Sequence, residues 1–72
     1  MPAISMQMLE GRTPAQKSDL IRRLSQATQD ALGVPEEAIL IVLTEVSADH
    51  WGVGSRTMSE IRGLEKIPRH DL

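Results

Sequence analysis

The feature that most limits how this chain can fold is an unbroken apolar run, Ala38-Ile39-Leu40-Ile41-Val42-Leu43. It contains no polar alternation and is rich in β-branched residues, which is typical of a strand buried on both faces, as in a parallel sheet. The chain has 72 residues, no cysteine and a single aromatic residue, Trp51. A core this small cannot cover both faces of such a strand, and disulfides or thiolate-bound metal are not available to stabilise it. We therefore expect other copies of the chain to cover the strand.

A strand and a helix are predicted before this run. Residues 3–8 alternate between apolar and polar side chains, which predicts a half-buried strand. Thr13 is a suitable helix N-cap, Pro14 suits the first helical position, and Gln16 completes a capping box. Gly33 is expected to end the helix in the C′ position. Strand, helix and strand in this length predict one β-α-β unit, hence an α/β fold with a right-handed crossover.

The predicted helix is amphipathic. Its apolar face is expected to hold Leu20, Leu24, Ala27 and Ala31, with Ile21, Thr28 and Leu32 alongside, and its solvent face to hold Lys17, Arg22, Gln26 and Gln29. Such a helix covers one side of a small sheet.

After the second strand the sequence changes to turns and a short helix. Residues 49–55 carry two glycines around Val53 and predict a short hairpin. Thr57-Met58-Ser59-Glu60 repeats the capping-box pattern and predicts one or two helical turns, ending at Arg62. We interpret residues 2–62 as one domain and residues 63–72 as a C-terminal tail.

Charge and composition exclude several classes of partner. The net charge is -2, and no basic stripe with interleaved aromatic residues would bind nucleic acid. The longest apolar run is far shorter than the ~20 residues that span a membrane, and no secretory signal is recognisable, so we expect a soluble, cytoplasmic protein. His50 and His70 have no ligand-like neighbours, and Gly52-Val53-Gly54 lacks the remaining residues of a phosphate loop, so no metal and no cofactor are expected.

One candidate for chemistry stands at the start of the chain. Pro2 follows Met1, and an initiator methionine is ordinarily removed before a residue as small as proline. Its removal would expose a secondary amine, whose pKa falls toward neutrality when the amine is desolvated or lies near a cation. A base of that kind is suited to moving protons at carbon. The Met-Pro start alone is weak evidence, because many proteins begin this way.

Residues 2–17, PAISMQMLEGRTPAQK, resemble the opening of the 4-oxalocrotonate (2-hydroxymuconate) tautomerase family. In that family a proline, a strand, Leu-Glu-Gly-Arg and a helix rich in Gln and Lys follow in this order. The similarity continues through residues 43–46 and 50–54 and covers about residues 2 to 62. It implies a β-α-β subunit in a homohexamer, a trimer of dimers, and a cofactor-free isomerase of aromatic degradation.

The resemblance also implies roles for three residues. Pro2 would act as general base and then acid, moving a proton in an enol or dienol of a 2-oxo acid such as 2-hydroxymuconate. Arg12 would hold a substrate carboxylate in a bidentate grip. Trp51 stands where the family commonly has a phenylalanine lining the proline's pocket, and it is equally suited to a subunit interface.

One position departs from the family pattern. Leu40 stands where the best-known members carry an arginine that engages the substrate from a neighbouring subunit, and an aliphatic side chain cannot bind an oxyanion. Efficient handling of the dicarboxylate 2-hydroxymuconate is therefore in question. Arg56 is a candidate substitute cation, with a solvated surface residue as the equal alternative.

Two other functions stay open at this point. One is a hydratase or dehalogenase-like activity on small unsaturated acids, for which no acidic, water-activating residue is clearly placed. The other is an inactive or structural subunit of a hetero-hexamer whose partner supplies the second arginine.

Overall fold

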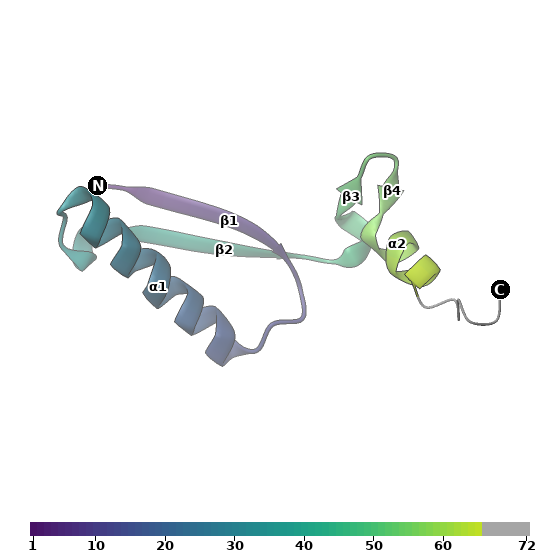
Figure 1. The fold of residues 1–72 in the computed structure, drawn as a ribbon, viewed down its shortest axis with the longest axis horizontal. Helices are drawn as coiled ribbons and strands as arrows, with labels where there is room; N and C mark the ends of the chain where they lie inside the picture. The colour runs from purple at the N-terminus through teal and green to yellow at the C-terminus, as the bar shows by residue number, and fades with distance from the viewer. Residues whose placement is uncertain (66–72) are drawn as a thin grey trace.

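The computed structural model describes residues 1–65 and contains the predicted β-α-β unit. Strands β1 (Ala3–Leu9) and β2 (Leu40–Val46) lie side by side in a parallel sheet. Helix α1 (Pro14–Leu32) connects them and runs along one face of the sheet (Figure 1). The predicted α/β class is therefore confirmed.

Backbone hydrogen bonds extend the pairing of the two strands at both ends. The Leu40 N–H donates to the carbonyl of Pro2, and the Glu10 N–H donates to the carbonyl of Val46, both at 3.0 Å. The residue before β1 is thus bonded to the start of β2, which fixes the position of Pro2 relative to the sheet.

Helix α1 begins and ends as predicted. The Gln16 N–H donates to Thr13 Oγ1 at 3.1 Å, and the Thr13 N–H donates to Gln16 Oε1 at 2.9 Å, so both halves of the capping box are formed. Gly33 ends the helix with φ 65°, and its N–H donates to the Gln29 carbonyl at 2.8 Å. This left-handed backbone conformation favours glycine, which has no Cβ to clash.

Strand β2 begins later than predicted, and only one of its faces is covered. Residues Glu36–Ala38 form a 3₁₀ turn, so the strand runs from Leu40 to Val46 and not from Ala38. Ile41 is half-buried, whereas Leu40 and Val42, on the opposite face, are each 52% exposed. As expected for a single chain, the one helix covers only one face of the strand, and the other face is left exposed.

The face of α1 that packs against the sheet carries both apolar and polar side chains. Lys17 and Gln29 were expected on the solvent face, but both are half-buried. Lys17 turns inward because its Nζ reaches Glu45 Oε1 on β2, 2.6 Å away. Of the residues expected on the apolar face, the half-buried ones are Leu20, Leu24 and Thr28, and the exposed ones are Ile21, Ala27, Ala31 and Leu32.

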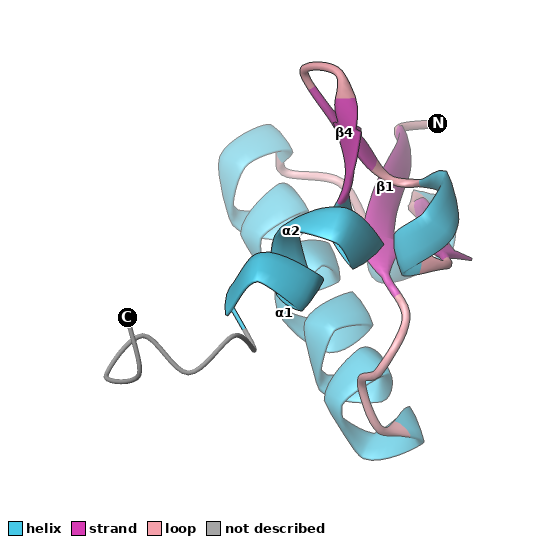
Figure 2. Ribbon diagram, turned by 90° about the vertical axis from the view of Figure 1, so that its right-hand side faces the viewer, coloured by secondary structure: helices cyan, strands magenta, loops and turns pink. Residues whose placement is uncertain are grey.

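The part of the chain after β2 folds into a separate small unit, here called the C-terminal arm (residues 47–65). It contains the 3₁₀ turn η2 (Ala48–His50), the hairpin strands β3 (Gly52–Val53) and β4 (Arg56–Thr57), and helix α2 (Met58–Glu65). The predicted hairpin is thus confirmed, with Gly54 at φ 63° in its turn. Figure 2 views the arm from its own side, with α2 in front and the hairpin rising beside it.

The predicted capping box of the short helix is also formed. The Glu60 N–H donates to Thr57 Oγ1 at 3.1 Å, and the Thr57 N–H donates to Glu60 Oε1 at 3.0 Å. Helix α2 runs on to Glu65, past the predicted end at Arg62. His70 and the rest of the predicted tail beyond Glu65 lie outside the described residues.

No side chain in the described part of the chain is fully buried within the single subunit. The radius of gyration, 17.1 Å, is well above the roughly 11 Å of a compact domain of this length. A single copy therefore has no closed core of its own. None of the helices within residues 1–65 is long and apolar enough to cross a membrane.

Candidate active site

Pro2 and Leu40 lie together at one end of the sheet. The hydrogen bond between the Leu40 N–H and the Pro2 carbonyl joins them at 3.0 Å, and the side chain of Pro2 is half-buried. The structure thus brings two of the predicted site residues into contact through the backbone. We call this region the Pro2 end of the sheet.

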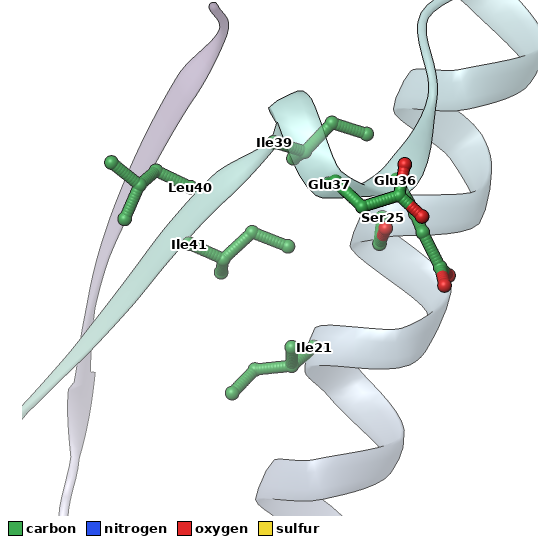
Figure 3. A pocket seen from close by; sticks show the side chains of 7 residues that line it. All are labelled: Ile21, Ser25, Glu36, Glu37, Ile39, Leu40 and Ile41. Atoms are coloured by element: carbon green, nitrogen blue, oxygen red, sulfur yellow. The ribbon is translucent and has the colours of Figure 1, made fainter.

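A hollow of about 500 Å³ opens at the Pro2 end, between α1, the 3₁₀ turn and β2 (Figure 3). Ile21 of α1 and Ile41 of β2 point toward one another across it, while Leu40 points away from the helix (Figure 3). The carboxylates of Glu36 and Glu37 stand on its helix side, and both residues are exposed. The complete lining is Ile21, Ser25, Glu36, Glu37, Ile39, Leu40 and Ile41. We call it the isoleucine pocket.

Arg12 lies at the opposite end of β1 from Pro2. The seven residues of β1 separate the two ends by about 23 Å, at ~3.3 Å per residue. The Arg12 side chain is exposed. A small acid cannot touch Pro2 and Arg12 of the same chain at once, so one chain does not bring together the predicted base and its predicted carboxylate anchor.

Trp51 also lies at the Arg12 end of the sheet, where the arm leaves β2. It is half-buried and lines a second hollow, of about 480 Å³, with Gln7, Val46, His50 and Gly52. Sequence reasoning did not single out Gln7, which alternation marks only as a solvent-facing strand residue. Gln7 lies near Trp51 because of the position of the C-terminal arm relative to the sheet, and no local sequence pattern predicts that position.

Two contacts hold the segment that carries Trp51. The Met58 N–H donates to the Trp51 carbonyl at 2.7 Å, and the Ser59 hydroxyl donates to Asp49 Oδ1 at 2.5 Å. Helix α2 is therefore tied to both sides of His50. The orientation of Trp51 depends on α2 as well as on the hairpin.

Arg56 is exposed on β4 of the arm, and the single chain does not place it beside Leu40. It lies near Glu60, whose pKa is lowered mainly by the backbone N–H of Thr57, then by the Thr57 hydroxyl, and to a smaller extent by the charge of Arg56. Its predicted use as a substitute cation at position 40 therefore stays a prediction that needs a second copy.

The arginines of α1 are already paired with an acid. Arg22 Nη2 lies 2.5 Å from Asp19 Oδ1, and Arg23 Nε lies 2.8 Å from Asp19 Oδ2. These two guanidinium groups, with the Arg22 hydrogen bond as the largest cause, lower the pKa of the Asp19 carboxyl. Within residues 1–65, no cluster of three or more His, Asp or Glu side chains is arranged to hold a metal ion.

The tautomerase family model, described as "Tautomerase enzyme", matches residues 2–60. The chain belongs to the tautomerase family. The 2-hydroxymuconate tautomerase of Pseudomonas sp. (strain CF600) is 37% identical over 62 residues, which cover 86% of this chain and 98% of the relative. The resemblance seen in the sequence is thus confirmed, and the chain is an isomerase of tautomerase type.

Two solved structures support the same assignment. TomN, a 4-oxalocrotonate tautomerase homologue of the tomaymycin biosynthetic pathway, is 35% identical, with a TM-score of 0.84 over 86% of this chain and 95% of its own. A heterohexamer 4-oxalocrotonate tautomerase from Chloroflexus aurantiacus J-10-fl is 40% identical, with a TM-score of 0.81 over 86% of this chain and 100% of its own.

Proposed function

We propose that this tautomerase-family protein is a cofactor-free keto–enol tautomerase of 2-oxo acids, with the amine of Pro2 as general base and then acid. The observation that carries the proposal is the place of Pro2, half-buried at the start of β1, in a chain that the family model matches from residue 2. The amine is a base only after Met1 has been removed, since the nitrogen of Pro2 is otherwise an amide.

The proposed reaction moves one proton and oxidises nothing. The Pro2 amine takes the proton of the enol hydroxyl and becomes a secondary ammonium, while the C–O bond becomes a carbonyl and the C=C electrons move to carbon. The ammonium then returns its proton to that carbon, or to the far end of a conjugated dienol. A half-buried amine serves this role because partial desolvation lowers its pKa toward neutrality.

We propose that each site is shared between copies of the chain. The ~23 Å between the two ends of β1 excludes a site made of Pro2 and Arg12 from one copy. A second copy can bring its Arg12 to the substrate carboxylate, where a guanidinium forms two parallel hydrogen bonds, and its Trp51 to cover the amine. The exposure of Leu40 and Val42, and the lack of a closed core, support such an assembly.

The assembly that we propose is a homohexamer, a trimer of dimers. A related solved protein is described as a heterohexamer, which supports an assembly of six subunits. The mixing experiment below tests whether all six are copies of this chain. Residues 2–62 are proposed as the functional unit, residues 63–72 as a tail, and the cytoplasm as the place of action.

The test uses protein confirmed by mass to begin at Pro2. Ketonisation of 2-hydroxymuconate and of phenylenolpyruvate is followed by ultraviolet absorbance for wild type, Pro2→Ala and Arg12→Ala. We expect Pro2→Ala to lose most of the ~10²–10⁴-fold that general acid–base catalysis contributes, and Arg12→Ala to raise KM. Arg23→Ala, an exposed arginine outside the proposed site, is the matched control and should retain activity. Full activity of Pro2→Ala would overturn the mechanism.

The same protein separates the alternatives. A structural subunit of a hetero-hexamer would be inactive alone and become active when mixed with its partner chain. A hydratase or dehalogenase-like enzyme would instead release products from haloacrylates. An active assembly made of this chain alone, with no turnover of haloacrylates, supports the tautomerase proposal against both.

A further inference from the structure

We propose, resting on the function proposed above, that the site at Pro2 selects 2-enol monoacids with an uncharged tail and discriminates against a second carboxylate. The inference comes from what surrounds the Pro2 end of the sheet. Apolar side chains and two carboxylates gather there, and the described cations of the same chain lie elsewhere or are already paired.

The charge around the isoleucine pocket is negative. Glu36 and Glu37 are the charged residues of its lining, both are exposed, and neither takes part in an ion pair within residues 1–65. A carboxylate placed in the pocket would meet two like charges, which is unfavourable at any separation shorter than the screening distance. The pocket therefore repels an anionic group.

The cations that could offset this charge are committed elsewhere. Lys17 binds Glu45 at 2.6 Å, while Arg22 and Arg23 both bind Asp19. Arg12 lies a strand's length away, as described above. The substrate can thus have its one carboxylate bound by an arginine from another copy, but the isoleucine pocket offers no cation for a second.

The remaining surface of the pocket is apolar and suits an uncharged tail. Ile21, Ile39 and Ile41 form most of its wall, whereas the side chain of Leu40 points away from it (Figure 3). It is an open hollow of about 500 Å³. An alkyl, vinyl or aryl tail would cover isoleucine side chains here and release water from them.

The test compares three enols that differ in the tail. 2-Hydroxymuconate carries a second carboxylate, 2-hydroxy-2,4-pentadienoate is the same dienol without it, and phenylenolpyruvate carries a phenyl ring. For wild-type protein we expect kcat/KM for each monoacid to exceed that for the diacid by about tenfold or more, equivalent to ~1.4 kcal/mol. Equal or faster turnover of the diacid overturns the inference while leaving the tautomerase proposal standing. Inactivity on all three enols overturns the tautomerase proposal itself.

Variants then assign the preference to particular residues. Glu36→Gln with Glu37→Gln removes the two charges of the pocket, so this double variant should raise the diacid-to-monoacid ratio of kcat/KM by about threefold to tenfold. Glu10→Gln is the matched control, since Glu10 is an exposed acid beyond the opposite end of β1 and outside the lining of the pocket. It should leave the ratio unchanged.

Assembly is measured beside activity, by analytical ultracentrifugation, so that a broken oligomer is not taken for a change in specificity. The ratio of two substrates on one preparation is also insensitive to the fraction of active protein. An unchanged ratio in Glu36→Gln/Glu37→Gln, with assembly intact, overturns the assignment of selectivity to this pocket. A lower kcat/KM for 2-hydroxymuconate in Arg56→Ala than in wild type would show instead that Arg56 of another copy supplies a cation for the second carboxylate. That result would also overturn the inference.

Discussion

Lys17 Nζ lies 2.6 Å from Glu45 Oε1, and this ion pair joins the first turn of α1 to the far half of β2. The two side chains are 28% and 31% exposed, so the pair is shielded on one side and open to water on the other. It is the contact that ties the Arg12 end of the sheet to the helix that follows Arg12. Its strength bears on how firmly the loop carrying Arg12 is held.

Replacing Glu45 by Gln should lower the free energy of unfolding by at most about 1 kcal/mol, because partly exposed ion pairs contribute little in water. The loss should shrink as salt is added, since salt screens the pair in wild type. Urea denaturation at low and high salt, at one protein concentration, measures both effects. Glu10→Gln, an exposed acid outside the described ion pairs, is the control. A loss that does not depend on salt would contradict an electrostatic origin.

Removing the hydroxyl of the α1 N-cap should also destabilise the chain. In Thr13→Ala the Gln16 N–H loses its acceptor at 3.1 Å, and helix N-cap replacements of this kind cost ~1 kcal/mol. Thr13→Ser keeps an oxygen at the same position and should retain most of the stability. The pair is compared by thermal unfolding followed by circular dichroism. If Ser were as destabilising as Ala, the cap would not be the cause.

The helix ends could be read from the sequence because each depends on residues only a few positions apart. Thr13 with Gln16, and Thr57 with Glu60, form their capping boxes within one turn, and Gly33 ends α1 through its own backbone conformation. The strand at residues 3–8 followed from their periodicity. These elements needed no knowledge of the rest of the fold.

Features that depend on distant residues could not be read in the same way. Lys17 resembles any solvent-facing lysine until Glu45 is seen beneath it, 28 positions later. The start of β2 moved because Glu36–Ala38 form a 3₁₀ turn, although Ala38 and Ile39 are as apolar as the strand itself.

The candidate site shows the same limit more sharply. Pro2 and Arg12 belong to one short motif, which makes them appear to be neighbours, yet the motif is an extended strand and places them at its two ends. The family resemblance proposed the two residues, and the strand between them means that one chain cannot combine them. The sequence did not indicate that Gln7 lines a hollow with Trp51, or that Glu36 and Glu37 border the isoleucine pocket. Both arrangements depend on the fold.

Loosening α2 should be visible in the fluorescence of Trp51, which is the chain's only tryptophan. In Ser59→Ala, Asp49 loses the hydroxyl that donates to it, and a typical net hydrogen bond contributes ~1 kcal/mol, so the open form of the arm should become roughly fivefold more populated. We expect red-shifted emission, lower anisotropy and faster quenching by iodide. Ser55→Ala, in the exposed hairpin turn, is the control and should match wild type. Identical spectra for Ser59→Ala and wild type would mean that the hairpin alone orients Trp51.

The cap of α2 should weaken in acid because it uses an ionised carboxylate. The N–H and hydroxyl of Thr57 both donate to Glu60 Oε1, at 3.0 and 3.1 Å, and these bonds hold the pKa of Glu60 below its ordinary value of 4.5. A pKa that is lower in the folded state means that the carboxylate stabilises α2 above pH 4.5, and that this contribution is lost as the pH falls through the folded pKa.

Trp51 emission and amide exchange within α2, followed from about pH 6 to about pH 3, should therefore report local opening in wild type as the pH falls. In Glu60→Gln the side chain still accepts hydrogen bonds but no longer titrates, so this acid-dependent step should disappear. Asp19 also titrates with a lowered pKa, but it lies on α1, so exchange within α2 separates the two. Glu10→Gln should keep the wild-type transition. An acid transition of α2 that survives in Glu60→Gln would contradict the assignment of this step to Glu60.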